Sequence, residues 1–235
     1  SHADINGPKR LKAKLDEIKP HVILGEGGKS HEFSMSQYLT ILERELKNQN
    51  VKPDFAEVIL NHIDRVNKTS DDAICKDYAL SNAAEFVYFE DKPTTKSITD
   101  IRGDIRREVR KKVKLYSSGA VTLEQYLSNL ENNQKAIQGI VDSAWQSLKY
   151  VEGTDEEKDF ALSQIESFNS LRGVSNGIGP RDKIMKLKLR EIVSARPRGL
   201  IATVTGAAHI FDDPQNRNLY GLIRDLNPQR IFLYD

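Results

Sequence analysis

The chain has 235 residues, enough for one sizeable hydrophobic core or two small ones, and its 35 Lys and Arg residues nearly balance its 34 Asp and Glu residues. This balance leaves no global field to attract nucleic acid or an anionic membrane, and the single cysteine, Cys75, excludes a disulfide framework and a multi-cysteine zinc site. The sequence has no run of about eighteen apolar residues and no apolar segment near its start, so we expect neither a transmembrane helix nor a signal peptide.

The first part of the chain alternates helix and strand patterns. Leucines and an isoleucine recur at helical spacing before Pro20, and a short apolar strand then stops at a glycine-rich turn that carries Glu26. A strand, a glycine-rich turn and a helix form half of a parallel βαβ unit. The elements expected here are a flexible lead-in (1–8), a helix (9–19), a strand (22–24), a helix (33–50), a strand or helix (55–67) and a strand (84–91).

The rest of the chain is helical at first and then alternates again. Thr154 and Glu157 have the spacing of a capping box at the start of a helix. The C-terminal strands are continuously apolar, which is typical of a buried parallel sheet. The elements expected here are helices within 97–170, a glycine-rich loop (172–180), a helix (181–196), a strand (200–205), a helix (216–226) and a final strand (230–235).

These patterns predict the α/β fold class, with one domain over 9–235. A central, mainly parallel sheet would be flanked by helices, and a helical insertion would occupy about 100–172. Ligands of open α/β sheets bind beyond the carboxyl ends of the strands. Glu26, Glu90 and His209 follow three expected strands at that edge. Imidazole combined with carboxylate suits either general acid–base catalysis or a divalent metal, and both uses stay open.

Motifs near both ends of the chain resemble a known superfamily. VILGE, followed by HEF at 31–33, is similar to the first motif of the erythromycin-esterase (EreA) and ChaN-like proteins, which are related to the TraB/TIKI group. RDKIMKLKLREI, the strand after it and GAAH at 206–209 resemble the closing motif of that group, and TDIRGDI resembles a middle element. The resemblance implies an EreA/ChaN-like fold with an esterase-like hydrolase crevice.

The resemblance also implies roles for individual residues. Glu26 and His31 would activate water or a substrate group, and His209 would be the partner base or a metal ligand. Arg181, a cation at a helix start where the helix dipole disfavours it, would hold an anionic or carbonyl group. A count without gaps puts Lys29 at the family's histidine position, and His31 takes that position if the loop is two residues longer. The implied substrate-binding residues are Lys29, Glu90, Asp100 and Arg102.

The compact length and the lack of an export signal narrow the resemblance to plant-pathogen type III effectors of the HopBA group. This implies a virulence effector, linked to host immunity and cell death, that is delivered into the host cytoplasm and meets a host protein or small-molecule substrate there.

The alternative is a non-enzymatic effector that binds a host protein on a vestigial esterase scaffold, tested on the basic helix that carries Arg106, Arg107 and Arg110. Aromatic residues are not interleaved with these basic ones, so we expect no nucleic-acid partner. Haem or metal binding ranks third, because the sequence has no axial-ligand signature beyond isolated His and Tyr residues.

Overall fold

The structure is a computed structural model, and it describes residues 6–28, 34–90, 98–148, 154–156, 163, 179–206, 209–210, 213–231 and 233. Its strands are β1 (Val22–Gly28), β2 (Glu85–Glu90) and β3 (Ile201–Val204). Its helices are α1 (Gly7–Ile18), α2 (Ser34–Asn48), α3 (Pro53–Lys68), α4 (Asp71–Ser81), α5 (Ile98–Ser117), α6 (Leu123–Leu148), α8 (Pro180–Ala195), α9 (Leu219–Leu222) and the 3-10 helix η4 (Arg224–Leu226).

The three strands form one parallel sheet in the order β2-β1-β3, which places β1 in the middle. Val22 is paired with Glu85 on one side and with Ile201 on the other. Because all pairings are parallel, the carboxyl ends of the strands meet at one edge of the sheet. The α/β class predicted from the sequence is confirmed at this level.

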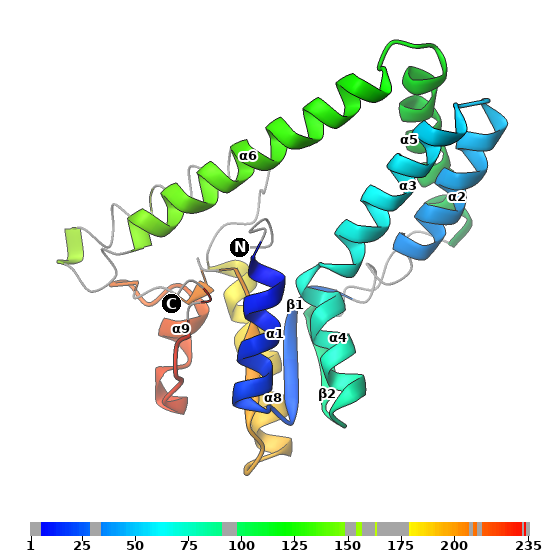
Figure 1. Ribbon diagram of the computed structural model, residues 1–235. Coiled ribbons are helices and arrows are strands. Elements are labelled where there is room, and N and C mark those ends of the chain that lie inside the picture. Colours follow the sequence, from blue (N-terminus) through cyan, green and yellow to red (C-terminus); the bar gives the residue numbers. More distant parts are fainter. Residues whose placement is uncertain are drawn as a thin grey trace.

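Helices cover both faces of the sheet (Figure 1). The middle strand serves both faces, because successive side chains of a strand point to opposite sides. Val22 and Leu24 pack against buried residues of α8, α9 and the turn after α9, namely Met185, Leu189, Ile192, Leu219 and Ile223. Ile23 packs on the opposite face against residues of α1 and α4, namely Leu11, Leu15, Cys75 and Tyr78.

A further core lies outside the sheet, in a helical cluster made of α2, α3, α5 and the start of α6 (Figure 1). Its buried residues are Leu42, Leu46, Val51, Phe55, Ile59, Val109 and Val113. The α2 helix follows β1 along the chain, yet it packs mainly against α3 and α5. The helical cluster therefore draws on residues 34–68 as well as on the expected insertion.

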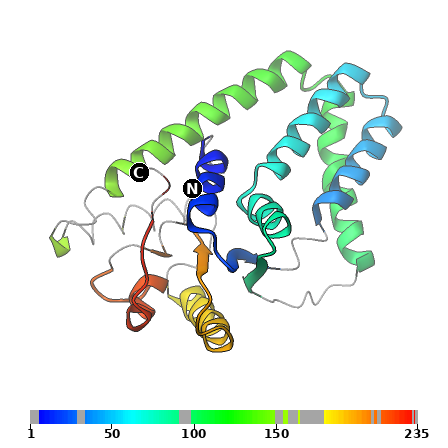
Figure 2. The same cartoon turned by 60° about the horizontal axis from the view of Figure 1, so that its bottom comes forward.

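The α6 helix leaves the helical cluster and continues across the molecule toward the side that carries α9 (Figures 1 and 2). Its 26 residues give it a length of about 39 Å. Among the described helices, α6 included, none is both long enough and apolar enough to cross a membrane.

Several sequence expectations are refined by the structure. The ambiguous segment 55–67 is helical, within α3, and α4 is a helix that the sequence pattern did not predict. The N-cap of α4 is Ser70, whose hydroxyl accepts from the N–H of Ala73 at 3.2 Å. The helix expected over 216–226 is divided into α9 and η4. Glu157 and residues 172–178 lie outside the described residues.

The final strand expected over 230–235 is wrong for the residues that the structure describes there. Arg230, Ile231 and Leu233 form no strand. Leu233 packs instead against the core under α1 and α4. The Arg230 guanidinium carbon lies 4.3 Å from the ring centroid of Tyr220. Side-chain packing, rather than backbone pairing, therefore holds this segment, in which Leu233 is partly buried and Ile231 stays exposed.

Candidate active site

Glu26 leaves the sheet at its carboxyl edge, on the face covered by α8. Val22 and Leu24 pack under α8, and Glu26 continues the same alternation along β1. Its Oε2 atom accepts a hydrogen bond from the N–H of Gly206, just after β3, at 2.7 Å. A Cβ atom on Gly206 would lie 3.3 Å from that oxygen, so a glycine lets the two strand ends approach this closely.

Arg181 holds the other oxygen of Glu26 from the first turn of α8. Its Nη1 donates to Glu26 Oε1 at 3.0 Å, and its Nη2 donates to the Glu26 carbonyl oxygen at 3.3 Å. A cation at a helix N-terminus is unfavourable for the helix dipole. The ion pair with Glu26 offsets that cost and explains why an arginine stands at this position.

Asp182 is the next residue on α8 and is fully buried. Its Oδ2 accepts from the N–H of Gly179 at 2.9 Å, which caps the helix. Its Oδ1 accepts from the N–H of Leu219, at the start of α9, at 2.6 Å. The same Oδ1 atom lies 2.8 Å from Nδ1 of His209. One carboxylate thus ties together α8, α9 and the segment after β3.

His209 lies between two carboxylates. Its Nδ1 faces Asp182, and its Nε2 lies 3.5 Å from Oε1 of Glu26. Burial lowers the pKa of His209, but hydrogen bonds to Asp182 and Glu26 and the negative charges of both carboxylates outweigh it and raise the pKa to about 9. The imidazole is therefore protonated near neutral pH, with an N–H at each ring nitrogen.

The four side chains of the site differ in their exposure to solvent. Asp182 and His209 are 0% and 9% exposed at their side chains, whereas Glu26 and Arg181 are 16% and 20% exposed. The interior pair is shielded, whereas Glu26 and Arg181 keep part of their side-chain surface in solvent. Two cations and two anions balance, so the site can exchange a proton internally between Glu26 and His209 without changing its net charge.

The structure brings together three of the four residues predicted to be catalytic, namely Glu26, Arg181 and His209. His31 and Lys29 lie outside the described residues. The protonation of His209 favours a proton donor over the base or metal ligand that the sequence led us to expect, because an imidazolium has no free lone pair.

Of the residues predicted to bind substrate, Glu90, Asp100 and Arg102 belong to other elements. Glu90 ends β2, where its backbone is opposite Gly28, and its side chain lies outside the description. Asp100 belongs to α5, and its side chain is also outside the description. Arg102, on α5, donates from Nε to Oε1 of Gln37 on α2 at 3.4 Å. Arg102 thus contributes to the packing of the helical cluster.

The basic helix considered as an alternative interaction surface is α5, and two of its arginines have partners inside the helical cluster. Arg110 Nε donates to Oε2 of Glu45 at 2.9 Å, and Arg106 Nε lies 3.6 Å from the other oxygen. Glu45 is buried. A test of this surface therefore belongs on Lys111 and Lys112, which are exposed.

Asp182 is the site residue that the sequence interpretation missed as a functional group. A signal was present: an acidic residue three positions after a glycine that precedes a proline matches the N3 position of a capped helix. That signal predicts a helix cap, and the cap is present. It does not reveal that the same carboxylate also meets His209, because that contact joins residues 27 positions apart.

Metal binding has no support in the part of the chain that the structure describes. Within it, no group of three or more His, Cys, Asp or Glu side chains is arranged to hold a metal ion.

Comparison of the chain with protein-family models, with curated proteins and with solved structures finds no match. The chemistry of the site therefore follows from its own geometry.

Proposed function

We propose that this chain is a hydrolase in which Glu26 acts as the general base and His209 as the general acid. The observation that supports this most directly is the distance of 3.5 Å between Glu26 Oε1 and His209 Nε2 at the carboxyl edge of the sheet. A carboxylate base beside a protonated imidazole supplies both halves of acid–base catalysis in one place.

The proposed cycle for an ester substrate is balanced in protons. Glu26 takes a proton from water while the water oxygen attacks the ester carbonyl. His209 donates its Nε2 proton to the leaving alcohol oxygen as the acyl–oxygen bond breaks. The products are a carboxylic acid and an alcohol. The proton on Glu26 then returns to Nε2 of His209 across the same 3.5 Å, which restores the starting state.

The neighbouring groups support these roles. Arg181 and the N–H of Gly206 hold the Glu26 carboxylate in one orientation, so that its position does not depend on the substrate.

The sequence resemblance supports a finer proposal about biological role. The motifs at both ends of the chain resemble those of the EreA/ChaN-like proteins, and the HopBA group of type III effectors is the branch they resemble most. On that basis the chain is an EreA/ChaN-like virulence effector, delivered through a type III system into the host cytoplasm. It would act there on a host small molecule or protein and promote host cell death.

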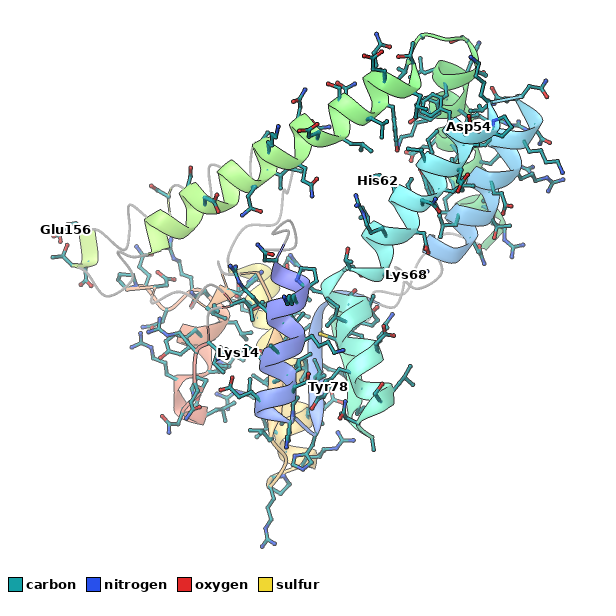
Figure 3. All side chains as sticks on the ribbon, viewed as in Figure 1. Lys14, Asp54, His62, Lys68, Tyr78 and Glu156 are labelled. Atoms are coloured by element: carbon teal, nitrogen blue, oxygen red, sulfur yellow. The ribbon has the colours of Figure 1, made fainter. Side chains whose placement is uncertain are left out.

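The test uses His209→Asn and Glu26→Gln, with His62→Asn as the matched control. His62 lies on α3 in the helical cluster (Figure 3). Its ring packs edge-on against Tyr126, with the ring centroids 6.4 Å apart. Each folded variant, checked by circular dichroism, is assayed for hydrolysis of a panel of aryl and alkyl esters and for cell death on expression in host tissue.

Loss of both activities in the two site variants, with the control unchanged, is the expected result. If the two site variants fold and keep both activities, the hydrolase proposal is wrong and the charged cluster is structural. A third outcome is possible: the wild type hydrolyses no ester of the panel, yet the site variants lose the cell-death activity. That outcome would exclude esters as the substrate class.

A further inference from the structure

We infer that Asp182 is the positioning residue of this site: it fixes the His209 ring with Nδ1 toward itself and with a protonated Nε2 toward Glu26. The catalytic consequence rests on the proposed function, whereas the placement of the ring does not. Asp182 is fully buried, so it acts through His209 and not through the substrate.

The position of the Asp182 carboxylate is set by two backbone donors. The N–H groups of Gly179 and Leu219 donate to its two oxygens at 2.9 and 2.6 Å, from α8 and from the start of α9. These bonds leave the carboxylate little freedom to rotate. The Oδ1 atom is then placed 2.8 Å from Nδ1 of His209, a distance typical of a hydrogen bond to a charged group.

The contact between Asp182 and His209 fixes where the ring carries its protons as well as how the ring is oriented. An ionised carboxylate accepts only, so Nδ1 of His209 must carry a hydrogen toward Asp182. The second charged group in contact with the ring is Glu26 from β1, at Nε2, and Arg181 from α8 is paired to Glu26 behind it. With acceptors at both nitrogens, the ring holds two protons and presents one of them to the reacting group.

The other buried aspartate of this region provides a matched control. Asp213 is 1% exposed, and its carboxylate accepts from the backbone N–H of Gln215 and from the backbone and side chain of Arg217. These partners lie within four residues of Asp213, so its carboxylate organises its own turn. Replacing Asp213 removes a buried carboxylate from the same part of the fold but leaves the contact between Asp182 and His209 intact.

The experiment measures the protonation of His209 directly by NMR in the full chain labelled at histidine, with His209→Asn used to assign the signal. In Asp182→Asn we expect the pKa of His209 to fall by about 1 to 3 relative to the wild type, and in Asp213→Asn to stay unchanged. The rate of ester hydrolysis should fall at high pH as His209 loses its proton. In Asp182→Asn this fall should begin at a correspondingly lower pH than in the wild type, and in Asp213→Asn it should not move. An unchanged His209 titration in folded Asp182→Asn overturns the inference, whatever the activity.

The two proposals fail separately. If no ester is hydrolysed but the His209 titration responds as expected, the positioning inference stands and the hydrolase proposal falls. If Asp182→Asn does not fold, the wild type decides the matter through the ring ¹⁵N chemical shifts of His209 at about pH 8. Protonation at both nitrogens supports the inference, and an unprotonated Nδ1 overturns it.

Discussion

Raising the pH from about 6 to about 9.5 should destabilise the wild-type fold by about 3 kcal/mol more than it destabilises His209→Asn. The pKa of His209 is raised from an ordinary value of 6.5 to about 9 in the folded chain. The folded state therefore binds the proton more tightly than the unfolded state. The resulting stabilisation is fully present below about pH 6.5 and is lost as the pH rises through about 9.

The magnitude follows from the size of that pKa difference. Each pKa unit corresponds to about 1.4 kcal/mol, so the difference between 6.5 and about 9 corresponds to roughly 3 kcal/mol. Little solvent screening applies, because the His209 side chain is only 9% exposed. Asparagine in its place is neutral throughout the range and still offers an N–H to Asp182.

The assay is urea unfolding of both proteins at several pH values across this range, followed by circular dichroism. The quantity of interest is the difference in unfolding free energy between wild type and variant at each pH. That difference should decrease steadily from the acid to the alkaline end. If the two proteins lose stability in parallel, His209 is not held protonated by Glu26 and Asp182, and the acid role proposed for it loses its basis.

Three other predictions concern packing and burial elsewhere in the core and in the helical cluster. Gly25→Ala should cost about 1 to 3 kcal/mol in urea unfolding, because a Cβ there would lie 2.8 Å from the ring of Phe86; an unchanged midpoint would contradict that packing. Cys75, buried and with its pKa raised to about 12 chiefly by burial, should react with a disulfide reagent only after unfolding, so fast labelling of the native chain would be inconsistent with its burial. Arg110→Ala should cost about 1 to 2 kcal/mol through its 2.9 Å hydrogen bond to buried Glu45, and full stability in that variant would show that this bond contributes nothing.

The convergence of Glu26 and His209 could be predicted from the sequence. Both follow apolar strands, and a parallel sheet brings such strand ends to one edge. A binding role for Arg181 could also be predicted, because the helix dipole disfavours a cation at a helix N-terminus unless an anion pairs with it. These inferences depend only on local patterns and on one general rule of sheet topology.

The remaining features depend on contacts that no local pattern encodes. The start of α9 donates to Asp182 from 37 residues away, and this contact makes a helix cap part of the site. Whether α2 covers the sheet or joins α5 depends on which apolar face matches it best. Leu233 packs, partly buried, against the core under α1 and α4, although its apolar neighbours resemble a strand. Tertiary packing decides each of these cases.

The order in which this chain is synthesised has a consequence for when it can act. Glu26 and Gly206, which hold the two sides of the site together, are 180 positions apart, and His209 and Leu219 come later still. A nascent chain can therefore complete the helical cluster long before β3 exists to pair with β1. The reactive groups can meet only after residue 209 has been synthesised, so chains that stop before it would lack the site. Refolding after full unfolding would likewise have to bring Glu26 and Gly206 back together before the site forms again, and such long-range pairing is slow.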